Sequence, residues 1–138
     1  MNFKYEKKSK EKLKQNYFAR VRKGYNGFED FDAFYNWYNA EEKICKYCGL
    51  TEEESQKIVM TSILKSNRFP ENGKIGQGKS RGVWLEVDRL EPKGQYSREN
   101  AVLCCYFCNN DKSDVFSGQE YLKFRENRIE YLRDRLKK

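Results

Sequence analysis

The sequence predicts a small α+β fold, made of a β-hairpin followed by a helix, with further helices at the N-terminus, in the centre and at the C-terminus. Residues 83–90 alternate in polarity like a strand, and residues 101–105 suit the returning strand of a hairpin. The third observation is two Cys-x2-Cys pairs, one far upstream of the hairpin and one directly after it. Such pairs are typical of metal sites, so we expect them to pin the hairpin and the helix together.

Two helices are predicted before the first cysteine pair. Apolar residues recur at helical spacing over residues 4–23, whose other faces carry lysine. Residues 28–42 give a broad aromatic stripe that favours core packing over base stacking and consists of Phe31, Phe34, Tyr35, Trp37 and Tyr38. We expect a single domain overall, with a basic helix in residues 1–27 and the cysteine-bound region in residues 28–138.

A central helix and a C-terminal helical region complete the prediction. Thr51 and Glu54 form a capping-box pattern at the start of the central helix, which we expect to continue to about Ser66. The last helical region begins near Cys108 or resumes at Ser117, and its amphipathic stripe to the C-terminus consists of Leu122, Ile129, Leu132 and Leu136.

The composition indicates a cytoplasmic protein with a thin core. Of the 138 residues, 38% are hydrophobic and 36% are charged, so stabilisation by a bound metal is expected. The mean hydropathy of −1.04 and the lack of a long apolar run exclude a transmembrane segment. The basic N-terminus also lacks the apolar stretch of a signal peptide. Because thiols stay reduced in the cytosol, paired cysteines indicate metal ligands rather than disulfides.

The net charge of +7 is concentrated at the N-terminus. Residues 1–23 hold nine Lys or Arg against two Glu, which equals the whole excess, while the remainder of the chain is balanced. A basic segment of this kind, which includes Lys12 and Lys14, suits contact with the phosphates of nucleic acid. The alternative interpretation is a solvated helix face that only keeps the protein soluble.

A basic loop is predicted over residues 67–82. Its regular pattern is interrupted by Pro70, Gly73, Gly76, Gly78 and Gly82. Its cations are Arg68, Lys74, Lys79 and Arg81. The loop would lie against DNA, or it would be a disordered surface insert, and the pattern leaves both interpretations open.

The four paired cysteines predict a structural zinc site. Tetrahedral zinc takes four thiolates, and each Cys-x2-Cys turn offers two of them from one backbone bend. The expected ligands are Cys45, Cys48, Cys105 and Cys108, with Gly49 supporting the first turn. Cys104 breaks the spacing and is expected to be a small buried apolar residue. Free thiols are the alternative interpretation.

The segments Cys45–Gly49 and Val83–Asp114 resemble the HNH endonuclease family, whose ββα-metal site is a hairpin and a helix pinned by zinc. The family pattern is an acid–His pair, an Asn before the second strand, then Cys-x2-Cys followed by His or Asn and by Lys. The matching residues are Asp88, Asn100, Cys105, Cys108, Asn109 and Lys112. The Asp-Arg pair and the Cys-Cys-x2-Cys-Asn run are similar to a subgroup found in phage and mobile-element proteins.

This resemblance implies a second metal ion, Mg²⁺ or Mn²⁺, bound by Asp88 and Asn109. A carboxylate and an amide oxygen suit such a hard cation. The resemblance also implies that Asn100 ties the backbone of the hairpin loop, and that Lys112 faces a phosphate one helical turn beyond Asn109.

One departure from the family concerns the catalytic base. The chain contains no His, and Arg89 stands at the position of the family's catalytic His. Arginine cannot act as a base, because its pKa stays above about 12, but it would clamp the scissile phosphate. Glu86 is the first candidate for activating water, since strand alternation places it on the face of Asp88, and Tyr96 and Lys93 in the hairpin loop are weaker ones. Alternatively Arg89 only pairs with Asp88, Asn109 caps a helix, and no second metal binds.

Three functions are compatible with these patterns. The leading interpretation is a metal-dependent endonuclease that hydrolyses DNA phosphodiester bonds. The alternative is a catalytically weak or inactive zinc module that binds nucleic acid or a protein partner. A third interpretation is an interaction or inhibitor protein that has borrowed the fold. None of the three needs a membrane.

Overall fold

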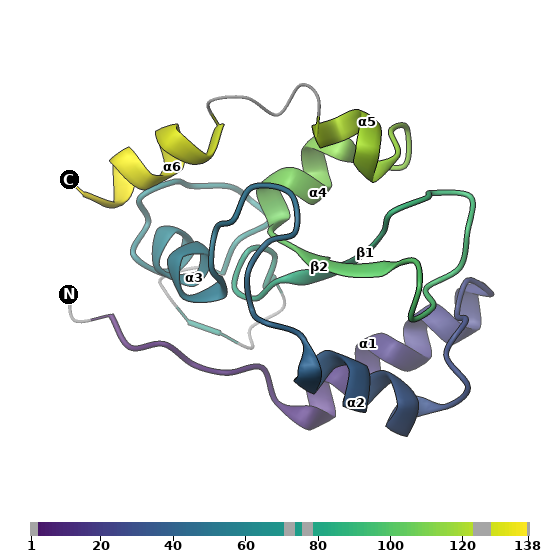
Figure 1. The fold of residues 1–138 in the computed structure, drawn as a ribbon. Helices are drawn as coiled ribbons and strands as arrows, with labels where there is room; N and C mark the ends of the chain where they lie inside the picture. Colours follow the sequence, from purple (N-terminus) through teal and green to yellow (C-terminus); the bar gives the residue numbers. More distant parts are fainter. Residues whose placement is uncertain (1–2, 71–73, 76–78, 123–127, 138) are drawn as a thin grey trace.

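A computed structural model of the chain describes residues 3–70, 74–75, 79–122 and 128–137. In chain order its elements are α1 (Lys10–Lys23), α2 (Phe31–Ala40), α3 (Glu52–Met60), β1 (Glu86–Arg89), β2 (Ala101–Cys104), α4 (Tyr106–Lys112), α5 (Gly118–Leu122) and α6 (Arg128–Leu136). The predicted α+β class is confirmed, with one antiparallel hairpin among helices. Figure 1 shows α1 and α2 on one side of the hairpin, and α3 and α6 near each other on the other. Within the described residues, no helix has the length and apolar character needed to cross a bilayer.

The hairpin is shorter than the sequence predicted. Its register pairs Glu86 with Cys104 and Arg89 with Ala101, so the predicted strand over 83–90 contributes only its second half. The returning strand stops one residue early, because Cys105 adopts the N-cap position of α4 and its sulfur accepts from the backbone N–H of Cys108. The register places Asp88 and Glu86 on one face of β1, as strand alternation requires.

The predicted N-terminal helix begins six residues later than expected. Ser9 caps α1 by accepting from the N–H of Lys12, and the residues before Ser9 are extended. The backbone of Glu6 explains this difference. Its N–H donates to Gln56 Oε1 at 2.8 Å, and its carbonyl accepts from Gln56 Nε2 and from Trp84 Nε1, both at 2.9 Å. These tertiary hydrogen bonds compete with helix formation, and the amide groups they occupy cannot join a helix.

The next two helices also differ from the prediction at their ends. Asp30 caps α2, which spans fewer residues than the predicted 28–42. The capping box of Thr51 and Glu54 is present at the start of α3. This helix ends at Met60 and not near Ser66, because Ser62 takes a φ of +58° and a left-handed residue ends a helix.

In the described part of the C-terminal region the helical residues form α4, α5 and α6, and residues 123–127 between the last two lie outside the described residues. α4 begins beside Cys108, and Ser117 and Glu120 form the expected capping box before α5. The amphipathic stripe is only partly buried: Leu132 is 3% exposed and Leu122 is 40% exposed.

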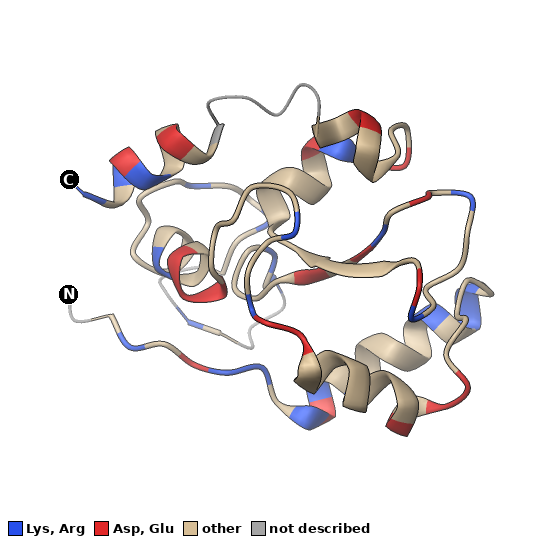
Figure 2. Ribbon diagram, in the orientation of Figure 1, with Lys and Arg blue, Asp and Glu red and all other residues tan. Residues whose placement is uncertain are grey.

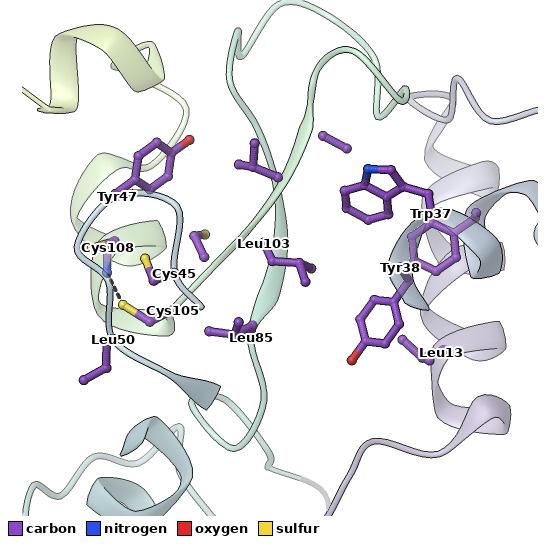
Figure 3. Close-up of a cluster of buried hydrophobic side chains, with 14 of the residues drawn as sticks. Leu13, Trp37, Tyr38, Cys45, Tyr47, Leu50, Leu85, Leu103, Cys105 and Cys108 are labelled. Atoms are coloured by element: carbon purple, nitrogen blue, oxygen red, sulfur yellow. Dashed lines mark hydrogen bonds between the residues drawn. The ribbon is translucent and has the colours of Figure 1, made fainter. Parts of the chain in front are cut away.

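The core fills the space between the cysteine pairs and the helices α1 and α2. Leu85 and Leu103 of the hairpin region lie between the cysteines on one side and Leu13, Trp37 and Tyr38 on the other (Figure 3). The aromatic residues of α2 join this core, and Phe34 is fully buried. The interpretation of this stripe as core is therefore confirmed.

The described part of the loop 67–82 packs against the body of the protein. Phe69 is buried and contacts Tyr106 edge-to-face, with ring centroids 5.4 Å apart. The Arg68 side chain donates to the Tyr106 hydroxyl and to Asn110 Oδ1. Gly73, Gly76 and Gly78 lie outside the described residues. Phe69 and Ile75 of this loop therefore join a second small core beside α4.

Candidate metal centre and active site

Four cysteines meet at one point of the structure. The sulfur atoms of Cys45, Cys48, Cys105 and Cys108 all lie within 4.8 Å of one another, and those of Cys48 and Cys105 are 3.7 Å apart. Four sulfurs at the usual Zn–S distance of about 2.3 Å around a tetrahedral ion are themselves about 3.8 Å apart. The cluster therefore has the donor type and the dimensions of a four-cysteine zinc site.

The local backbone explains why the first pair converges. The N–H of Cys45 donates to Leu50 O at 2.8 Å, and the N–H of Gly49 donates to Cys45 O at 3.0 Å, which closes the turn. Gly49 takes a φ of +82°, a conformation that glycine adopts readily. The N–H of Lys46 then donates to Leu103 O at 2.9 Å and fastens the turn to β2.

The fifth cysteine stays outside the cluster. Cys104 is fully buried, and burial raises the pKa of its thiol well above the usual value. Within the cluster, hydrogen bonds from Cys105 first, and then from Cys108 and Cys48, lower the pKa of Cys45 strongly. The neighbouring sulfurs thus stabilise the thiolate of Cys45, the form that binds metal, while Cys104 stays a neutral apolar side chain.

Asp88 is held between the cysteine turn and α4. Its Oδ2 atom accepts a hydrogen bond of 2.6 Å from the Tyr47 hydroxyl and lies 3.1 Å from Lys112 Nζ. Burial, and then the bond to Asp88, raise the pKa of Tyr47, so the phenol stays protonated and donates. The Lys112 side chain is 1% exposed and also donates to Arg89 O at 3.1 Å. Lys112 therefore does not face outward toward a phosphate, as the resemblance implied, but neutralises Asp88 from inside.

This buried pair makes a stability prediction. Asp88→Ala should cost about 3–5 kcal/mol of unfolding free energy, because it leaves the Lys112 ammonium buried without its partner. The double variant Asp88→Ala/Lys112→Met removes both charges and should be clearly more stable than Asp88→Ala alone. Urea denaturation of the two variants measures the difference. Equal unfolding free energies for the two variants would show that the unpaired charge of Lys112 is not what destabilises Asp88→Ala.

Asn109 faces β1 from the first turns of α4. Its Nδ2 atom donates to Glu86 Oε1 at 2.8 Å, and Arg81 holds the same carboxylate through two bonds of 2.6 and 2.9 Å. In the described part of the chain, Asn109 Oδ1 and Asp88 Oδ1 have no hydrogen-bond donor. Asn109 and Asp88 therefore both lie where α4 packs against β1, Asn109 bonded to Glu86 and Asp88 paired with Lys112.

Arg89 points to the opposite face of β1 from Asp88. Its guanidinium lies over the rings of Tyr25 and Tyr96, at 4.7 and 5.1 Å, and donates to Gly94 O at 3.0 Å. Asp88 is paired with Lys112 instead. The alternative in which Arg89 only neutralises Asp88 is therefore wrong.

Asn100 organises the hairpin loop. Its Oδ1 accepts from the N–H of Glu91, and its Nδ2 donates to the carbonyls of Glu91 and Gln95, at 2.9–3.1 Å. Gly94 approaches so closely that a Cβ there would lie 2.7 Å from Asn100 Nδ2. This is the arrangement that the resemblance implies for Asn100.

The basic residues singled out from the sequence lie on different surfaces. Lys12 lines a cavity beside β1, whereas Lys14 lies over the Phe31 ring at 5.8 Å. Lys74 and Lys79 are exposed, and Arg81 is tied to Glu86. Figure 2 shows Lys and Arg along the N-terminal segment and at both ends of α1.

Sequence reasoning missed Tyr47 and Arg20 as site residues. Tyr47 occupies the last x position of the first Cys-x2-Cys turn, and its contact with Asp88 spans 41 residues. Arg20 belongs to the basic stripe of α1, but only the fold places it in the lining of one cavity with Glu86 and Asn109. No local sequence pattern distinguishes either residue from its neighbours.

Comparison with known proteins identifies a structural neighbour. No protein-family model and no curated protein sequence matches the chain. The fold is similar to that of PacI, a rare-cutting HNH restriction endonuclease whose mechanism of DNA perturbation has been described. The similarity has a TM-score of 0.65 and 25% sequence identity, and it covers 89% of this chain and 78% of that one. The fold of this chain is thus similar to that of an HNH endonuclease over most of its length.

Proposed function

We propose that this protein is a metal-dependent endonuclease of the HNH type that hydrolyses phosphodiester bonds of DNA. One observation supports the proposal: in a fold similar to that of an HNH restriction endonuclease, a four-cysteine cluster lies beside a hairpin and a helix, and Asp88 of β1 and Asn109 of α4 both lie where these two elements pack together. Thiolates that bind zinc must stay reduced, so this proposal includes a reducing compartment such as the cytoplasm.

Two kinds of metal ion fit the residues present. The four sulfurs suit a structural Zn²⁺ ion. With four protein ligands such an ion has no open coordination position for a substrate. Asp88 Oδ1 and Asn109 Oδ1 suit Mg²⁺ or Mn²⁺, which prefers oxygen ligands and keeps several waters. When bound there, such an ion supplies charge stabilisation to the phosphate and acidifies a bound water.

Two further residues near β1 have roles in the proposed hydrolysis. Hydrolysis joins a water oxygen to phosphorus and breaks one P–O ester bond, which leaves a phosphomonoester and a hydroxyl. Arg89 lies on the other face of β1, with its guanidinium over two tyrosine rings, and would present its permanent positive charge to the DNA backbone beside the cleaved bond. Glu86 receives three donor contacts from Arg81 and Asn109, so both of its carboxylate oxygens are already occupied. Its role in this proposal is therefore to orient the Asn109 amide.

Incubation of supercoiled plasmid with the purified protein tests the proposed function. We expect nicking with Mg²⁺ or Mn²⁺ and none when EDTA removes the divalent ion. The reason is that a bound metal ion lowers the pKa of the attacking water. Zinc content is measured in parallel, so that loss of the fold is not mistaken for loss of the catalytic ion. Absence of nicking with either ion, by a zinc-loaded and folded protein, would contradict the proposal.

A catalytically weak or inactive nucleic-acid-binding module is the second candidate. The buried ion pair favours it, because Lys112 already neutralises part of the charge of Asp88 that a metal ion would need. The chain also lacks histidine, the usual base. This module would shift DNA in a gel at low salt without divalent metal and would cut it with none.

A further inference from the structure

A basic cavity lies between α1 and β1, next to the proposed active site. It has a volume of about 380 Å³, which is within the range of small-ligand sites. Its α1 wall is made by Lys12, Asn16 and Arg20, which follow one another at helical i, i+4 spacing and so share one face. The opposite wall includes Glu86 and Asn109.

Arg20 has the features of a cation without its anion. Its guanidinium lies 4.8 Å from the Phe34 ring centroid and 5.5 Å from that of Tyr96. In the described part of the chain, its Nη2 atom is buried with no hydrogen-bond partner, and no carboxylate pairs with it. Burial lowers the pKa of Arg20, since the charge is removed from water. A buried unpaired donor is costly, so such a group indicates a missing ligand.

Lys8 adds a second charge of the same sign to this cavity. Burial, and then the charge of Arg20, lower the pKa of Lys8 to about 8. Glu86 lines the same cavity, but Arg81 and Asn109 already occupy its oxygens. The two cations therefore stand close together without a free carboxylate among the lining residues.

Tyr96 connects this cavity to Arg89. Both guanidinium groups lie against its ring, that of Arg20 at 5.5 Å and that of Arg89 at 5.1 Å. Among the described residues, neither arginine forms an ion pair. Planar guanidinium forks suit the oxygens of phosphate, and two of them in a row suit the successive phosphates of one strand.

We propose that the α1–β1 cavity is a second phosphate subsite, in which Arg20, flanked by Lys8 and Lys12, binds a backbone phosphate of DNA next to the phosphate held at Arg89. The inference rests on the proposed function, because it takes DNA as the ligand of the site. It gives the N-terminal segment a defined role as one wall of the substrate channel.

DNA binding measured as a function of salt tests this subsite. Fluorescence anisotropy with a labelled duplex, without added divalent metal, compares the wild type, Arg20→Gln and the control Arg22→Gln. Arg22 carries the same charge on the same helix but is exposed. Loss of one phosphate contact should lower the slope of log K against log salt by about 0.9 and weaken binding roughly tenfold at 0.1 M salt. We expect Arg22→Gln to stay within about twofold of the wild type. Equal effects of the two variants would overturn the subsite.

Two further variants keep the test decisive if Arg20→Gln does not fold. Lys12→Gln alters a half-buried residue of the same cavity, and Lys23→Gln is its exposed control at the end of α1. Lys12→Gln should reduce the salt slope and Lys23→Gln should not. Arg20→Lys should retain most of the slope, because the charge remains. An unchanged slope for Lys12→Gln would overturn the subsite as well.

Binding and cleavage failures can be distinguished in this design. A wild type that binds DNA with an Arg20-dependent slope but never nicks it would support the subsite and overturn the proposed nuclease. A wild type that nicks DNA while Arg20→Gln matches Arg22→Gln would overturn the subsite alone. Failure of the wild type to bind any duplex, with binding of an acidic peptide instead, would overturn the assignment of phosphate as the ligand.

Discussion

Cys105→Ala should abolish the folded state at room temperature. A four-cysteine zinc site contributes roughly 10–16 kcal/mol in apparent binding free energy, whereas a domain of this size has a net stability of about 5–15 kcal/mol. Cys105 also caps α4, so its loss releases both the metal and the start of that helix. Circular dichroism during heating should show no cooperative transition, and elemental analysis should find no bound zinc.

Cys104→Ala is the matched control for this prediction. Cys104 is adjacent in sequence and fully buried, but it lies outside the sulfur cluster. We expect one zinc ion per chain and a cooperative transition, with a loss of about 1 kcal/mol from the smaller side chain. If Cys104→Ala lost zinc and Cys105→Ala kept it, the assignment of the four ligands would be wrong.

Asn109→Ala should reduce DNA cleavage by roughly 10²–10³-fold or more while the protein stays folded. The change removes one of the two oxygens proposed to bind the catalytic ion, and it frees Glu86 from its amide contact. Asn109 is half-buried and lies outside the zinc cluster, so its loss should cost little stability. Initial rates of plasmid nicking with Mn²⁺ measure the effect.

Asn110→Ala tests whether this loss is specific. Asn110 is the next residue of α4, has the same side chain and is exposed, with its Oδ1 atom bound to Arg68. We expect nearly full activity from this variant. Equal nicking by wild type and Asn109→Ala would remove Asn109 from the site. Asp88→Ala is a less informative variant, because it also leaves the buried Lys112 ammonium without its partner and so destabilises the fold.

Local patterns predicted the parts of the fold that depend on neighbouring residues. The capping box of Thr51 and Glu54, the alternation of β1 and the two Cys-x2-Cys turns all act over a few residues. The spacing of the cysteines also predicted which thiols would meet, since Cys104 alone breaks it. These signals were sufficient for the α+β class and the cluster.

Long-range contacts explain what the patterns did not predict. The helical pattern of residues 4–23 includes Glu6. In the structure, however, the Glu6 carbonyl accepts hydrogen bonds from Gln56 and Trp84, and these bonds hold the segment outside the helix. Lys112 fits a phosphate-facing helix position in sequence, but α4 turns it toward Asp88. In both cases a partner more than 20 residues away decides the conformation.

The location of the divalent ion tests the proposed active site most directly. Crystals of the zinc-loaded protein grown with Mn²⁺ would locate each metal by its anomalous scattering. We expect a zinc signal among the four cysteine sulfurs and a separate manganese signal at Asp88 and Asn109 that Asn109→Ala removes. A manganese signal that is absent from the contact between β1 and α4, or that persists unchanged in Asn109→Ala, would contradict the assignment of these two residues as the catalytic metal site.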